Sequence, residues 1–251
     1  MLRPLLITIT LALLMGCVTT GDMQPMRTDE GREQARQAYL ALAKGYLQEG
    51  MTAQAKAPLQ SVLDMNRNDG EALEVLALVF QREMEYDLAE QHFKRALSAS
   101  DRETRILNNY GGFLLEQKRY KEAYSIFTEA SKDTMYVHRA RVFENLGVTA
   151  LSLDKKDKAY DYFRRALRLN ARQPRVLLEL GILSYERQDY VGARGYYESF
   201  IAMSEHNSRS LLLGARLARV FENRDEAASL GLQLRRLYPA SAEYQMYKSE
   251  R

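Results

Sequence analysis

The side chains that most often carry out acid–base or metal chemistry are few and widely separated in this sequence. Its three histidines, His92, His138 and His206, share no spacing typical of a metal site or a catalytic pair. Acidic pairs such as Asp29 and Glu30 occur where solvated helix ends would place them, and no glycine-rich phosphate loop or Ser-His-Asp order is found. We therefore expect no catalytic residue, no metal site, no cofactor and no enzymatic activity.

The N-terminal residues are typical of an exported protein. Arg3 precedes an apolar run from Leu5 to Met15, which is too short to cross a bilayer, since a spanning helix needs about 20 residues. Residues 1–16 are therefore predicted to be a signal peptide, and the mature chain should begin after them.

The only cysteine follows this region directly. The run Leu14-Met15-Gly16-Cys17 resembles the lipobox of bacterial lipoproteins. The resemblance implies that Cys17 is the lipid attachment site. Because each buried acyl CH₂ contributes about 0.8 kcal/mol, several chains would hold the protein at a membrane. Inner-membrane lipoproteins typically carry Asp after the cysteine, and Val18 stands there, which implies an outer-membrane anchor with the body facing the periplasm. Residues 17–35 lack apolar periodicity and are predicted to form a flexible tether.

Composition favours a helical interaction protein. The chain has 251 residues, 46% of them apolar, with 14 Gly and 5 Pro, too few turn formers for an all-β fold. Its 36 Lys and Arg exceed 33 Asp and Glu by 36 − 33 = 3, so a surface built to neutralise phosphates is not expected. Nucleic acid is excluded as a predicted partner, and no small-molecule substrate is indicated.

A repeat of 34 residues, with one spacing of 36, organises the chain from residue 36 to residue 241. Its eighth and twentieth positions are small, for example Gly111 and Ala123, and its fourth and twenty-fourth are bulky, for example Leu107 and Phe127. These spacings predict two helices per unit, with a turn near positions 15 to 17. The six predicted units are 36–69, 70–103, 104–139, 140–173, 174–207 and 208–241.

This pattern resembles a tetratricopeptide repeat (TPR) array. The resemblance implies an all-α superhelix of six helix-turn-helix repeats followed by a capping helix at residues 242–251. In the sixth unit the twenty-fourth position is Gly231 rather than a bulky residue, which departs from the pattern.

The resemblance also implies a binding groove lined by the first helix of each unit. An apolar stripe there is expected to hold an apolar segment of a client protein. The alternative is that part of this stripe is buried by superhelical curvature. The candidate partner-binding residues are Leu40, Leu47, Leu78, Asn109, Leu115, Asn145, Val148 and Leu151. The groove positions of the sixth unit are basic (Arg209, Arg216 and Arg219), either to meet an acidic surface or to keep the end of the array soluble.

The overall layout, with the runs 108–113 (NNYGGF) and 120–123 (YKEA), resembles the type IV pilus biogenesis and stability lipoproteins, the pilotins of the PilF type. That resemblance implies binding of secretin subunits and promotion of their outer-membrane localisation and multimerisation, for pilus biogenesis and twitching motility. Two alternatives remain open. One is a TPR lipoprotein subunit of outer-membrane barrel assembly or another periplasmic scaffold. The other is a peptidoglycan-cleaving enzyme, for which the repeats leave no residues.

Overall fold

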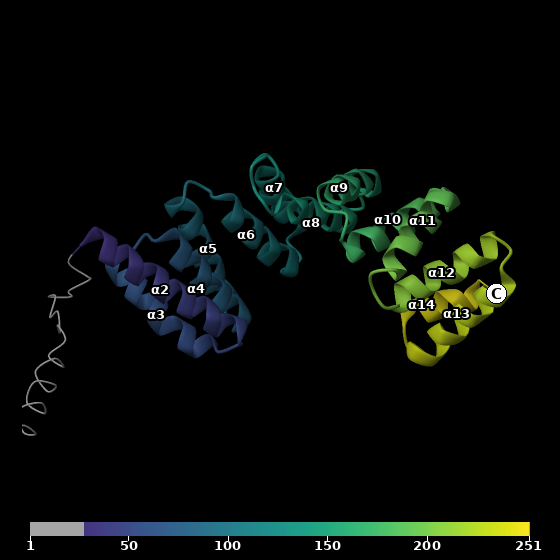
Figure 1. The fold of residues 1–251 in the computed structure, drawn as a ribbon, viewed down its shortest axis with the longest axis horizontal. Coiled ribbons are helices and arrows are strands. Elements are labelled where there is room, and N and C mark those ends of the chain that lie inside the picture. Colours follow the sequence, from purple (N-terminus) through teal and green to yellow (C-terminus); the bar gives the residue numbers. More distant parts are fainter. Residues whose placement is uncertain (1–27, 251) are drawn as a thin grey trace, which may run out of the picture. The chain divides into compact units, whose positions relative to one another are not determined.

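The structure, a computed structural model, describes residues 28–250, and every regular element in that range is an α-helix (Figure 1). Residues 1–16, Cys17 and the tether up to residue 27 lie outside the described residues. Within 28–250, no helix is both long enough and apolar enough to cross a membrane. The helices are α2 (Asp29–Gln48), α3 (Thr52–Met65), α4 (Gly70–Arg82), α5 (Tyr86–Ala99), α6 (Thr104–Glu116), α7 (Tyr120–Ala130), α8 (Arg139–Ser152), α9 (Lys156–Leu169), α10 (Pro174–Glu186), α11 (Tyr190–Ile201), α12 (Ser208–Val220), α13 (Arg224–Leu237) and α14 (Ala242–Ser249).

The first described helix begins earlier than the sequence predicted. A tether was expected up to residue 35, whereas α2 begins at Asp29. Thr28 caps the helix, because its Oγ1 accepts a hydrogen bond from the N–H of Gly31 at 3.0 Å. Asp29 and Glu30 lie in the first turn, where the helix dipole favours negative charge. Capping and charge therefore extend α2 through a stretch that has no apolar periodicity.

The described residues divide into two compact units, 28–96 and 97–250, and the division falls within α5. In the first unit, α2 packs against α3, and both contact α4. In the second unit, four hairpins follow one another: α6/α7, α8/α9, α10/α11 and α12/α13. Within this second compact unit, the second helix of one hairpin contacts the first helix of the next, so these hairpins bury apolar faces against one another.

The small residues of the repeat lie where the two helices of a hairpin meet. A Cβ atom added to Gly111 would lie 2.6 Å from the ring of Phe127, and one added to Gly147 would lie 2.4 Å from the ring of Phe163. Both phenylalanines are fully buried, which stabilises each hairpin by about 1.5–3 kcal/mol per ring. The small residue at the twentieth position is buried in all six units: Ala55, Ala89, Ala123, Ala159, Ala193 and Ala227.

Every hairpin turns at the same place in the repeat. The fifteenth residue of each of the six repeats has a positive φ, between 56° and 78°, and only in the first repeat is this residue a glycine. The next residue donates its N–H to a carbonyl five residues earlier, as Glu85 does to Phe80 at 2.9 Å and Lys155 does to Ala150 at 2.8 Å. This is a Schellman ending of the first helix. The six left-handed residues are Gly50, Met84, Lys118, Asp154, Gln188 and Glu222.

Helix α14 closes the second unit by packing on α12 and α13. Ser241 caps it, accepting from the N–H of Tyr244 at 3.1 Å. Tyr247 is 3% exposed and belongs to a core cluster with Leu211 and Ala215, and Tyr244 packs against the same cluster. The expected departure at Gly231 has its cause here, because the Tyr247 ring lies directly over that glycine.

Candidate partner-binding surface

The first helices of the hairpins carry the residues that the sequence assigned to partner binding. Seven of the eight are partly exposed, two in the first compact unit and five in the second compact unit. In the first unit these are Leu47 on α2 and Leu78 on α4. In the second unit they are Asn109 and Leu115 on α6 and Asn145, Val148 and Leu151 on α8.

Leu40, the eighth residue, is 3% exposed and offers no surface to a partner. It stands at the fifth position of its unit, and most of its equivalents are buried as well, including Asn108, Leu178 and Leu212. The reason is that successive first helices touch: α2 contacts α4, α6 contacts α8, and α10 contacts α12. The alternative that part of the stripe is buried therefore holds for this position, and the exposed part of each first helix is narrower than expected.

The two groove asparagines lie in different surroundings. Asn145 donates from Nδ2 to Oδ1 of the buried Asn108 at 3.1 Å, which links α8 to α6. Asn109 is partly exposed on α6. The Asn145 amide is thus already engaged within the chain, and its role includes holding two first helices together.

A small hollow lies between first helices near the C-terminal end of the second unit. It has a volume of about 190 Å³ and is lined by Ile182 and Tyr185 of α10, Leu212 of α12 and Met246 of α14, with Arg209 and Arg216 among its polar residues. Small-molecule sites usually have about 300–1,000 Å³, so this hollow suits a single apolar side chain of a peptide better than a free ligand. Met246, 49% exposed, was not among the sequence candidates, because it belongs to the helix beyond the repeats.

The basic residues of the sixth unit have acidic partners within the chain. Arg209 donates two hydrogen bonds to Glu179, at 2.6 and 2.8 Å, and Glu179 is only 5% exposed. Arg216 and Arg219 both pair with Glu250, which follows α14. The sequence suggested that these arginines either meet an acidic surface or keep the end of the array soluble, and neither role included acidic partners within the chain. These partners lie about 30 residues away in the sequence. The pairs join α10 to α12 and hold α14 in place.

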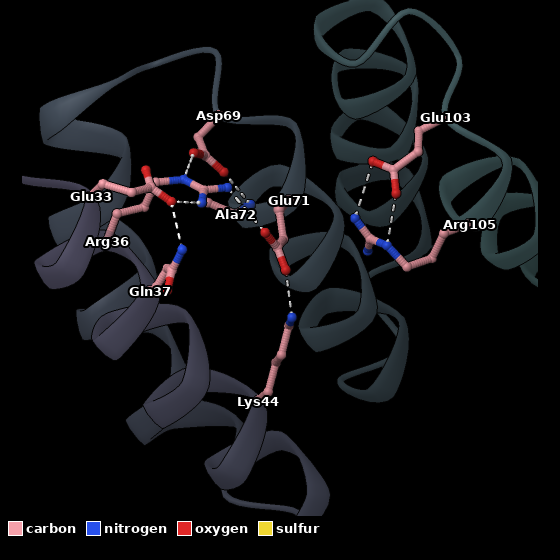
Figure 2. Close-up of polar contacts among 9 residues, drawn as sticks. All are labelled: Glu33, Arg36, Gln37, Lys44, Asp69, Glu71, Ala72, Glu103 and Arg105. Carbon is pink, nitrogen blue, oxygen red and sulfur yellow. Dashed lines mark hydrogen bonds and ion pairs between the residues drawn. The ribbon is translucent and has the colours of Figure 1, made fainter. Parts of the chain in front are cut away.

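A second network, at the beginning of the first unit, was also missed from the sequence (Figure 2). Arg36 of α2 donates to Asp69 and, at 3.0 Å, to Glu71. Asp69 also caps α4 by accepting from the N–H of Ala72 at 2.8 Å. These carboxylates raise the pKa of Arg36, with the Asp69 hydrogen bond as the largest cause, so the guanidinium stays charged. Lys44 adds a further bond to Glu71.

Two of the three histidines, His92 and His206, are partly buried and pack against aromatic rings. His92 stacks on Phe80 with 5.2 Å between the ring centroids, and burial together with the nearby Arg95 lowers its pKa. His206 stacks on Tyr197 at 6.1 Å, and burial lowers its pKa. Within residues 28–250, no group of three or more His, Cys, Asp or Glu side chains is placed to hold a metal ion.

Comparison with known proteins bears out the fold. The family model of the tetratricopeptide repeat matches residues 40–103, 80–133 and 144–208. The type IV pilus assembly protein PilF of Pseudomonas aeruginosa (strain PAO1) is 54% identical to this chain over 238 residues, which cover 95% of this chain and 94% of PilF.

Solved structures agree with this match. The structure of P. aeruginosa PilF has a TM-score of 0.85 and 53% identity, covering 88% of this chain and 100% of that one. PilW, described as a widely conserved type IV pilus biogenesis factor, has a TM-score of 0.71 and 26% identity, covering 85% of this chain and 98% of that one. The all-α TPR fold predicted from the sequence is confirmed.

Proposed function

We propose a function from one established premise: this chain belongs to the tetratricopeptide repeat family and, within it, to the PilF-type proteins of type IV pilus assembly. The proposed function is to bind secretin subunits and to promote their localisation and multimerisation at the outer membrane. In the proposal, acyl chains on Cys17 anchor the protein, and the helical body faces the periplasm. No reaction is catalysed.

The observation that carries this proposal is the set of partly exposed apolar residues on successive first helices. Leu47 and Leu78 present such a surface in the first unit, and Leu115, Val148 and Leu151 do so in the second. In the proposal, this surface covers apolar segments of secretin subunits before the ring forms. An apolar surface held close to the membrane would supply that cover and would raise the local concentration of subunits.

The binding step is tested by a matched pair of substitutions in one hairpin. Leu78→Glu places a charge on the proposed surface of α4, whereas Leu88→Glu places the same charge on α5, where the leucine is already 40% exposed. Capture of the secretin by the Leu78→Glu protein should fall at least tenfold, and capture by the Leu88→Glu protein should stay near wild type. Equal capture by both variants would remove α4 from the binding surface.

The anchoring step is tested by Cys17→Ser. The variant should fractionate with soluble periplasmic proteins, and secretin multimers in the outer membrane should decrease. Normal outer-membrane fractionation of the variant would refute the lipid anchor. If wild type copurified with barrel-insertion components in cells without pili, the barrel-assembly alternative would replace the secretin proposal.

A further inference from the structure

The connection between α7 and α8 displays two large apolar side chains on a restrained loop. Met135 and Val137 are 86% and 85% exposed, more than any other large apolar side chain of the described residues. Hydrogen bonds nevertheless restrain this loop. Asp133 accepts hydrogen bonds from the Thr104 hydroxyl at 2.7 Å and from the N–H of Met135 at 2.9 Å, and Arg139 donates to the carbonyl of Ser131 at 3.2 Å. The apolar tip is therefore presented in a fixed geometry.

A hollow of about 470 Å³ opens beside this tip. Its walls come from residues 134–141 on one side and residues 169–175, the end of α9 and the start of α10, on the other. Val137 and the half-exposed Leu169 supply apolar wall, so an apolar side chain from outside would find contacts on both sides. We call residues 134–141 and 169–175 together the insertion surface.

Positive charge dominates the lining. Arg139, Arg141, Arg172 and Arg175 face one carboxylate, Glu144, so the charged side chains sum to 4 − 1 = +3. Arg175 lies 3.8 Å from Glu144, and the guanidinium of Arg139 lies over the ring of Phe143. Arg141 and Arg172 are exposed, and no ion pair with another described residue accounts for either. Two cations thus flank an apolar wall without an acidic partner in the described part of the chain.

We propose that the insertion surface binds an acidic segment of a partner protein, with carboxylates between Arg141 and Arg172 and an apolar side chain against Val137 and Leu169. Charge complementarity selects the acidic segment, because bidentate arginine contacts to carboxylates are strong and specific. The tetratricopeptide repeat is a protein-binding fold, which favours a protein partner over a membrane surface. The insertion surface includes the first turn of α8, but it uses none of the later α8 residues Asn145, Val148 and Leu151, which belong to the first-helix surface proposed for the secretin.

Fluorescence anisotropy on the full-length protein in detergent tests the proposal at physiological salt. The probe is a labelled peptide of alternating aspartate and leucine, and its control carries lysine in place of aspartate. The doubly substituted Arg141→Glu, Arg172→Glu protein should bind the acidic peptide at least about tenfold more weakly, which corresponds to about 1.4 kcal/mol. Val137→Ser should weaken binding severalfold, because it removes the proposed apolar contact. The fold should stay intact, because the Val137 side chain is 85% exposed.

A matched variant separates a defined site from general electrostatics. Arg235→Glu with Arg236→Glu changes the charge equally at two exposed positions of α13, and it should bind the acidic peptide within about twofold of wild type. Equal losses in both double variants, equal binding of the lysine peptide, or no binding of the acidic peptide would overturn the proposal. Arg141- and Arg172-dependent binding to phosphatidylglycerol vesicles without peptide binding would assign the surface to a membrane instead, and would also overturn it.

Discussion

The hydroxyl oxygen of Tyr247 lies 1.9 Å from the point where a Cβ atom of residue 231 would be, and residue 231 is a glycine. In the third and fourth repeats, the bulky residue at the twenty-fourth position is a phenylalanine of the second helix, and its ring packs over the glycine of the first helix, as Phe127 does over Gly111. In the sixth repeat the twenty-fourth residue is Gly231, and α14 supplies an aromatic ring there instead. The last repeat and the capping helix are therefore one packing unit.

Gly231→Ala should destabilise the end of the array. The added methyl group overlaps the buried Tyr247 ring, and overpacking of this kind costs about 1–3 kcal/mol. Gly195→Ala on α11 is the control, because nothing lies within 4 Å of its added Cβ. Urea unfolding would measure the stability of the two variants, and hydrogen exchange of the α14 amides in the folded proteins would measure the local effect. Equal protection of α14 in the two variants would contradict the packing.

Two neighbouring glycines on α6 offer a sharper comparison. A Cβ on Gly111 would lie 2.6 Å from Phe127, whereas Gly112 has nothing within 4 Å. Gly111→Ala should therefore cost about 1–3 kcal/mol, and Gly112→Ala should gain up to about 1 kcal/mol from its better helix propensity. Melting temperatures that move in the same direction would show that the register of the repeat is misassigned.

The left-handed turns predict opposite effects at two equivalent positions. Gly50 has φ 78°, and an added Cβ would meet only one atom, at 3.9 Å, so Gly50→Ala should lose about 1 kcal/mol through backbone strain alone. Met84 has φ 62° and is 73% exposed, so Met84→Gly should relieve strain and gain up to about 1 kcal/mol. Gly45→Ala within α2 serves as the control and should stabilise. The midpoints of chemical unfolding would measure the stability of the three variants. A destabilised Met84→Gly protein would argue against strain at this position.

Much of the fold could be predicted because the same positions of each repeat carry the small and bulky residues that pack between helices. The small and bulky residues of each unit, such as Ala123 and Phe127, are buried as their spacing indicates. The polar contacts could not be predicted, since Arg209 meets Glu179 and Arg216 meets Glu250 only after the helices have stacked. Burial of Leu40 was uncertain for the same reason: curvature between first helices is set by three-dimensional packing, and a helical period alone does not reveal it.

Stability should decrease below neutral pH through the partly buried His92. Burial lowers the pKa of His92 in the folded state, whereas the unfolded chain has an ordinary value of about 6.5. The unfolded state therefore binds more protons as the pH falls through about 6.5, and the stability due to neutral His92 is present above that pH and lost below it. His92→Gln should show a smaller drop in melting temperature between pH 7.5 and pH 5.5 than wild type. Identical drops would mean that His92 does not contribute.

The left-handed residue that ends each first helix gives this stack a built-in set of local reporters. Positive φ at Met84, Lys118, Asp154, Gln188 and Glu222 depends on the hairpin around it. Arrays of this kind unfold through partly folded forms, because each repeat contacts only its neighbours. Backbone chemical shifts at these five amides would then tell, hairpin by hairpin, which part of the molecule opens first under stress or on engaging a client.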